Sequence, residues 1–95
     1  MAAYWVATYQ SVSDPDKLAA YAKLAAPAIE ANGGKFLARG TAAHAYEAGI
    51  KQRTVVIQFA SVDAAVAAHD SPGYQAALKA LAGGCVGDMR IVEGV

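Results

Sequence analysis

Hydrophobic and polar positions along residues 2–10 follow the two-residue period of a β-strand. One side of this segment carries Trp5, Ala7 and Tyr9, and the other side carries Tyr4, Val6 and Thr8. Aromatic and β-branched side chains favour an extended backbone. Because large apolar side chains point both ways, we expect both faces of this strand to be covered.

A helix is predicted to follow, because the apolar period changes to three or four residues. Asp14 is a typical N-terminal capping residue, and Pro15 suits the first helical position. The apolar stripe continues to Ile29. Pro27 lies inside it and removes a backbone hydrogen bond, so we expect a kink or a pair of short helices. Gly33 suits the left-handed C-terminal end.

Three further segments have strand character, at residues 35–43, 53–59 and 88–93. Strict alternation in the first would place Phe36 and Ala38 on one face and Leu37 and Arg39 on the other. Residues 53–59 are apolar on both sides, like the strand near the N-terminus.

Residues 61–82 are predicted to be helical with one interruption. Ser61 is placed to cap the start. Asp70 to Gly73 then breaks the pattern, and Ser71 can cap a second helical segment that Pro72 opens. A pair of glycines after residue 82 ends the helix.

The predicted order β-α-β-β-α-β indicates an α+β protein. Two right-handed crossovers put both helices on the same face of an antiparallel sheet, which is the ferredoxin-like arrangement. We expect residues 1–95 to form a single domain, since this length is too short for two cores. The apolar side chains on the uncovered face predict a homodimer, because a second copy would cover them.

Composition narrows the classes of function. Hydrophobic residues make up 56% of the chain, but 24 residues are alanine, which buries little area, so the core of one copy is thin. The formal net charge of +0 argues against nucleic-acid binding, and no apolar run approaches the ~20 residues that span a membrane. Cys85 is the single cysteine, and the first residues lack the basic start of a signal peptide. We therefore expect a cytoplasmic protein without disulfides.

Four short sequences, in order, resemble domain-of-unknown-function family 1330. They are Gly33-Gly-Lys-Phe-Leu-Ala-Arg-Gly40, Arg53-Thr-Val-Val-Ile-Gln-Phe59, Ser71-Pro-Gly-Tyr-Gln75 and Ile91-Val-Glu-Gly94. The resemblance covers essentially the whole chain and implies the dimeric α/β-barrel group, in which two ferredoxin-like subunits pack their sheets face to face. That group includes cofactor-free monooxygenases, decarboxylating or isomerising enzymes and ligand binders. The chain departs from the pattern at Ala68-His69, Gly73 and Leu81, where the family commonly has an aromatic pair, glutamate and arginine.

His69 is the candidate catalytic residue, because a histidine can act as a general base near neutral pH. Asp70 follows it directly, but adjacent residues on a helix do not face each other, so we do not expect the two to form a relay. The alternative role is that of an exposed histidine near a helix end.

Arg39 is a candidate ligand-binding residue, since an arginine within a sheet needs a partner and a bound carboxylate would provide one. Arg53 and Arg90 raise the same question with weaker signals. The alternative roles are an ion pair with a carboxylate of the same chain, at Glu47, Asp88 or Glu93, or an extended side chain whose charged end reaches solvent at the sheet edge.

Tyr21, Tyr46 and Tyr74 are possible pocket residues, because each combines apolar area with a hydroxyl group, and we select Tyr21 and Tyr74 as ligand-binding candidates. Packing between helix and sheet is their alternative role. Ser71 is also a ligand-binding candidate, although it has the simpler role of a cap. We expect neither a metal nor a cofactor, since the chain has two histidines and no Cys-x-x-Cys. The roles of His44, Cys85 and Arg90 are left open.

Three hypotheses of function follow. The first is a small cofactor-free enzyme of the monooxygenase or isomerase kind, in which Arg39 holds a polar or anionic substrate and His69 or a tyrosine moves a proton. The second is a protein that binds a small molecule in the same pocket without turnover. The third is a dimer with a purely structural role. The sequence leaves open whether the protein is an enzyme.

Overall fold

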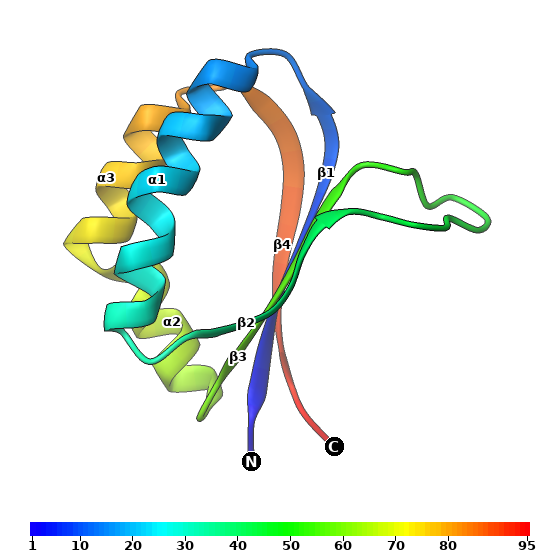
Figure 1. Ribbon diagram of the computed structural model, residues 1–95. Helices are drawn as coiled ribbons and strands as arrows, with labels where there is room; N and C mark the ends of the chain where they lie inside the picture. The colour runs from blue at the N-terminus through cyan, green and yellow to red at the C-terminus, as the bar shows by residue number, and fades with distance from the viewer.

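The computed structural model describes residues 1–95 as two layers, a four-stranded antiparallel sheet and three helices that cover one of its faces (Figure 1). The strands lie in the order β2-β3-β1-β4. This arrangement confirms the ferredoxin-like fold class, with the second helical segment divided in two. The elements in chain order are β1 (Ala3–Val12), α1 (Pro15–Ala31), β2 (Lys35–Thr41), β3 (Arg53–Phe59), α2 (Val62–Asp70), α3 (Pro72–Leu81) and β4 (Cys85–Glu93).

Side-chain caps explain where the helices begin. Asp14 caps α1 and Ser61 caps α2, as predicted. The hydroxyl group of Ser71 accepts a hydrogen bond from the backbone N–H of Tyr74 at 3.3 Å and donates one to the carbonyl of Ala68 at 2.7 Å. One side chain therefore joins the end of α2 to the start of α3.

None of the three helices has the length and apolar character that crossing a bilayer requires.

The predicted pair of short helices around Pro27 is wrong. α1 continues through Pro27 without interruption and ends at Ala31. Proline lacks the N–H that would bond to the carbonyl of Lys23, but both residues are exposed, so water can solvate that carbonyl. Gly33, with φ of +88°, follows the end of this one long helix.

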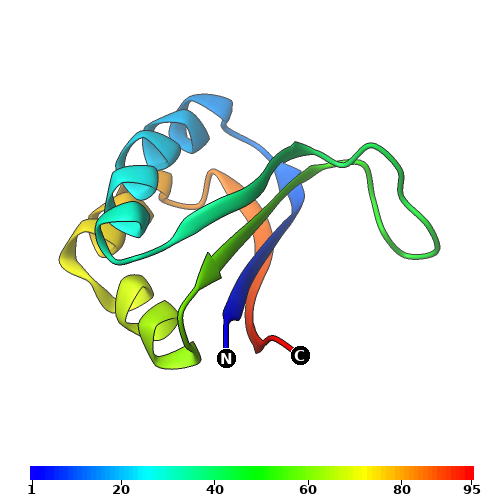
Figure 2. The ribbon, with the colours of Figure 1, turned by 60° about the horizontal axis from the view of Figure 1, so that its bottom comes forward.

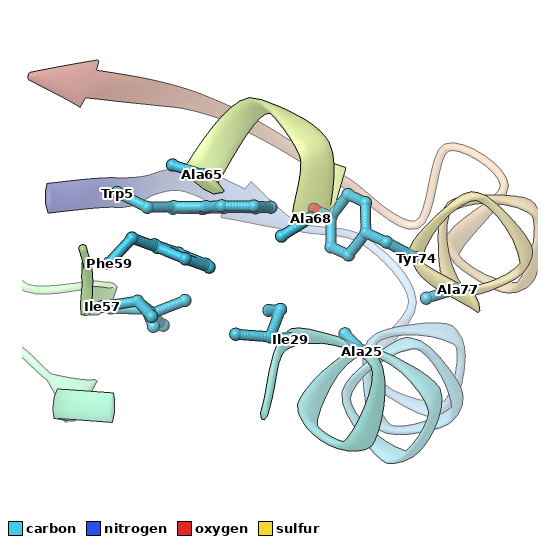
Figure 3. Packing of buried hydrophobic residues seen from close by; sticks show 10 residues of the cluster. Trp5, Ala25, Ile29, Ile57, Phe59, Ala65, Ala68, Tyr74 and Ala77 are labelled. Carbon is cyan, nitrogen blue, oxygen red and sulfur yellow. The ribbon is translucent and has the colours of Figure 1, made fainter. Parts of the chain in front are cut away.

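Trp5 lies at the centre of the core (Figure 3). Its ring stacks on Phe59 with an interplanar angle of 21° and meets the ring of Tyr74 edge-on at 80°. The sheet supplies most of the large buried side chains, whereas the helices supply mainly small ones. The buried helical residues are Ala25, Ile29, Ala65, Ala68, Tyr74 and Ala77.

A β-bulge in β2 corrects the predicted faces of this strand. Phe36 and Arg39 are three residues apart, yet they lie opposite β3 residues that are two apart, so Leu37 is an extra residue in the ladder. Phe36 and Arg39 therefore share the face that the helices cover, and Ala38 lies on the other face. Strict alternation had placed Phe36 and Arg39 on opposite faces.

The second face of the sheet has no cover within the chain, and we call it the open face. Tyr4, Val6 and Val56 alternate with buried residues and point to it, together with Val92, which is 54% exposed. A long loop, residues 42–52, extends away from the helices in both views (Figure 2). Apolar side chains of β1, β3 and β4 are therefore in contact with solvent on the open face.

Gly34 provides a test of the packing between α1 and the sheet. An added Cβ atom would collide with Cγ2 of Ile29 and lie 2.8 Å from Cζ of Phe59, and both residues are almost fully buried. We expect Gly34→Ala to lower the free energy of unfolding by about 1–3 kcal/mol, because the methyl group overpacks the core. Urea denaturation measures this. Gly40→Ala is the control, since nothing lies within 4 Å of its Cβ position, and equal stability of the two variants would contradict this packing.

Candidate functional site

The space between α1 and the sheet contains a narrow cavity of about 30 Å³. Eleven of its thirteen lining residues are hydrophobic, and the other two are Arg39 and Arg53. Small side chains of α1 form the helical wall, at Ala22, Ala25 and Ala26. The cavity exists because these alanines do not reach the sheet.

The cavity has a polar end and an apolar end, as the strand register explains. β1 and β3 are antiparallel, with Ala7 opposite Val55 and Trp5 opposite Ile57. Tyr9 and Arg53 follow the same alternation beyond Ala7 and Val55, and they lie at the end where α1 contributes Tyr21. The apolar end lies deeper in the core and is lined by Trp5, Ile29 and Ile57.

Two positive charges face this cavity without a negative partner. Arg39 lies opposite Val55, two residues along the same face from Arg53, so the two arginines are diagonal neighbours on adjacent strands. The ion pairs of the chain are His69–Asp70 and Arg90–Asp88, and neither cavity arginine takes part in one. Nε of Arg53 is buried and has no hydrogen-bond partner. None of the residues that line the cavity is acidic.

Arg39 therefore forms no ion pair, and its place on the edge strand β2 fits the other alternative role, a side chain whose charged end reaches solvent. Its side chain is exposed, and its guanidinium carbon lies 4.5 Å from the centre of the Phe36 ring. Such stacking is a typical weak arrangement for arginine at an exposed position. The guanidinium group stays available at the mouth of the cavity.

Tyrosine hydroxyl groups complete the polar end. The hydroxyl oxygens of Tyr21 and Tyr74 are 2.7 Å apart and hydrogen-bonded. Burial raises the pKa of Tyr21 and of Tyr74, and it raises the pKa of Tyr9 although the positive charge of Arg53 acts in the opposite direction. These three side chains are therefore neutral at physiological pH and act as hydrogen-bonding groups rather than as bases.

A second cavity, of about 220 Å³, lies between α3 and strands β1 and β4. Trp5, Tyr9 and Tyr21 line both cavities, and Tyr74 and Cys85 line only the second. Burial raises the pKa of the Cys85 thiol, which makes it a poor nucleophile. The second cavity therefore adds room beside the tyrosines. Its acidic lining residue, Asp88, accepts a hydrogen bond from the hydroxyl group of Thr8 at 3.3 Å and lies 3.7 Å from Arg90.

The structure brings together some of the predicted site residues. Arg39 and Tyr21 line the same cavity, and Tyr74 joins them through its hydrogen bond to Tyr21. His69 lines neither cavity. Its ring packs against the rings of Trp5 and Tyr74, with the ring centroids 6.0 and 5.3 Å away. Ser71 also lines neither and acts as a cap.

The expectation that His69 and Asp70 do not face each other is wrong. Nδ1 of His69 lies 2.9 Å from Oδ1 of Asp70. α2 ends at Asp70, so the following backbone is extended and the carboxylate is free to turn back toward the ring. The carboxylate is 67% exposed, and the pair lies at the surface rather than at a cavity.

The other open residues lie outside the cavities between the sheet and the helices. His44 and Tyr46 belong to loop 42–52, where Tyr46 is 79% exposed. Arg90 is exposed and lies 3.7 Å from Asp88. No group of three or more histidine, cysteine, aspartate or glutamate side chains is arranged to hold a metal ion.

Sequence reasoning ranked Arg53 low and did not select Tyr9, although a signal for both was present. Arg53 precedes Val55 by two residues, so the alternation of β3 places it on the covered face. Tyr9 follows Trp5 by four residues and lies on the same side of β1 for the same reason.

The buried tyrosines predict a loss of stability in alkali. A tyrosine of the unfolded chain ionises near its ordinary pKa of 10.0, whereas burial raises the pKa of Tyr21 in the folded chain. Above about pH 10 the unfolded state therefore binds fewer protons than the folded state, and the free energy of unfolding falls as pH rises. We expect thermal unfolding midpoints to decrease above this pH, and to decrease less steeply in Tyr21→Phe.

At neutral pH, Tyr21→Phe also leaves the hydroxyl of Tyr74 without its partner, which lowers the free energy of unfolding by about 1–3 kcal/mol. Tyr46→Phe is the control, because Tyr46 is exposed. Midpoints that stay constant through the alkaline range would show that the tyrosines are not buried as described.

Solved structures of other proteins share this fold. A protein of unknown function from Rhodopseudomonas palustris has a TM-score of 0.74 at 18% identity, covering 99% of this chain and 82% of its own. A candidate antibiotic biosynthesis monooxygenase from Caulobacter crescentus has a TM-score of 0.64 at 21% identity, covering 99% and 90%. SnoaB, a cofactor-independent oxygenase from Streptomyces nogalater, has a TM-score of 0.64 at 16% identity, covering 99% and 93%. At these identities the likeness establishes the fold alone.

Among proteins of curated function, none matches this sequence. A family model described as "Domain of unknown function (DUF1330)" matches residues 2–95, which is nearly the whole chain. The match confirms the resemblance that the short sequences around Arg39, Arg53 and Ser71 indicated. The chain belongs to the DUF1330 family.

Proposed function

We propose that this protein is a cytoplasmic homodimer that binds a small polar or anionic organic molecule in the cavity between α1 and the sheet. One observation carries the proposal: Nε of Arg53 is buried without a partner at an apolar cavity that has no acidic lining residue. An unpaired donor on a buried charged group is unfavourable, and a bound acceptor would remove that penalty. Arg39 and the hydroxyl groups of Tyr9 and Tyr21 supply further donors around the same space.

The open face supports the homodimer. Val6 and Val56 lie directly opposite each other in the ladder, and Val92 on the neighbouring strand is 54% exposed. A second copy related by a two-fold axis would cover these side chains, because the same patch meets itself in such a dimer. The resemblance to the dimeric α/β-barrel group favours the same arrangement.

Ligand binding without a general base is favoured over proton-transfer catalysis. Burial raises the pKa of the tyrosines and of Cys85, so none of these groups is ionised at neutral pH. His69 lines neither cavity, and Asp88 lines only the second, where it is paired with Thr8 and Arg90. Cofactor-free oxygenase chemistry is the second candidate, since SnoaB has the same fold and the paired hydroxyls of Tyr21 and Tyr74 would orient a substrate by hydrogen bonds.

A thermal-shift screen of small organic molecules tests the binding site. We expect binding molecules to raise the unfolding midpoint of the parent and of Ala20→Leu, but not of Ala26→Leu, because Ala26 lines the cavity and Ala20 is exposed on the same helix. Mass spectrometry of the bound molecule after incubation in air separates binding from turnover. Shifts of equal size in Ala26→Leu would place the molecule elsewhere and contradict the proposal.

Sedimentation equilibrium tests the dimer. The parent should have twice the mass of one chain, and Val56→Glu should weaken association by about tenfold or more, because it buries an unpaired charge in the interface. Val66→Glu is the matched control, since Val66 is 43% exposed on α2, away from the open face. A monomeric parent, or a Val56→Glu variant that associates as tightly as Val66→Glu, would contradict the interface.

A further inference from the structure

We propose that the ligand of the α1 cavity is a monocarboxylic acid with a narrow apolar body, and that Arg53 binds its carboxylate. This inference rests on the proposed binding function. It adds the chemical class of the ligand and the residue that selects it.

The charges around the cavity call for a negative ligand. Arg39 and Arg53 are diagonal neighbours on one face of the sheet, and neither forms an ion pair with the protein. No aspartate or glutamate lines the cavity. A neutral ligand would leave the buried Nε of Arg53 beside apolar walls without a negative partner, which is unfavourable. An anion would supply that partner, and Arg39, exposed at the mouth, would add a second positive charge near it.

The unpartnered Nε of Arg53 favours a carboxylate. In any guanidinium group, the N–H on Nε points parallel to one N–H of the neighbouring terminal nitrogen. Two parallel donors match the two oxygens of a planar carboxylate. A phosphate would bring a second negative charge into a space where eleven of thirteen lining residues are hydrophobic, and the desolvation of that charge would oppose binding.

The rest of the cavity defines the body of the acid. Beyond the polar end, the walls are the alanines and Ile29 of α1 on one side and Trp5 and Ile57 of the sheet on the other. This cavity has a volume of about 30 Å³, and the second cavity, which shares Trp5, Tyr9 and Tyr21 with it, adds about 220 Å³, so a slender body such as an unbranched chain or a flat ring fits best. Arg39 is exposed at the mouth, where its side chain is free to move aside as the ligand enters and then to contribute a second donor.

Pairs of acids and neutral amides of the same shape test this proposal in the parent protein. Isothermal titration calorimetry with hexanoate and hexanamide, and with benzoate and benzamide, should show that at least one acid binds about tenfold or more tightly than its amide. The preference should stay constant between about pH 6 and 9, because arginine remains charged there, whereas a histidine in the site would change it near pH 6.5. Equal binding of acid and amide would overturn the assignment.

Substitutions test whether Arg53 causes the preference for the acid over the amide. Arg53→Met should remove the preference for the acid, and Arg53→Lys should restore part of it, because lysine keeps the charge but lacks the paired donors. Arg90→Met should behave like the parent, since Arg90 is exposed and pairs with Asp88. Unfolding midpoints of all variants confirm that they fold. A preference that survives in Arg53→Met would contradict the role of Arg53.

The outcomes separate this proposal from the one on which it rests. If amides or other neutral molecules bind, and Ala26→Leu abolishes that binding, the cavity is a binding site and the carboxylate assignment is wrong. If no molecule binds in a manner that depends on Ala26, the proposed function itself is wrong, whatever the charge of the probe.

Discussion

Helices whose buried side chains are mainly alanine cannot fill the layer above a sheet, and most features of this protein follow from that constraint. Four of the six buried helical residues are alanines, so the large side chains of the sheet must fill the space between the layers. Trp5, Ile57 and Phe59 do so in the centre. Side chains of the sheet fill this space only where the covered face carries a large apolar residue.

At one end of the sheet the covered face lacks a large apolar residue, and the polar end of the cavity lies there. The covered face of β3 changes from Val55 to Arg53, and that of β1 ends in Tyr9. These side chains carry polar groups that cannot pack against alanine without partners of their own. Tyr21 finds one in Tyr74, whereas Nε of Arg53 finds none. The site is therefore the part of the core that alanine helices leave incomplete.

The parts of the fold that depend on local chemistry were predictable from the sequence. The alternation of β1 and β3, and the caps at Asp14, Ser61 and Ser71, involve only residues close in the chain, and the structure confirms them. The resulting order of elements was enough to define the fold class. It also identified Tyr21 as a residue of the layer between helix and sheet.

Features that depend on contacts between distant segments were not predictable. The bulge at Leu37 depends on how β2 pairs with β3, and no local pattern indicates it. Arg39 was therefore selected as a site residue but assigned to the face opposite Phe36. Arg53, which opens β3, gave a weaker signal than Arg39, and its unpartnered Nε becomes visible only when α1 is packed above it. The turn of Asp70 toward His69 is local instead: it follows from the end of α2 at Asp70, and the rule for neighbours within a helix does not hold at the last helical residue.

The same bulge has a consequence for how the family can diverge. Because Leu37 is the extra residue of the ladder, its loss would shorten β2 while the residues on either side kept their partners on β3. Phe36 would still face the helices, and Arg39 would still face the cavity. A change in chain length at this point is thus neutral for the geometry of the site, whereas a single insertion or deletion between Arg39 and the end of β2 would reverse the faces beyond it. A related chain that lacks one residue at this point would therefore lose the bulge and keep an arginine position that faces the cavity.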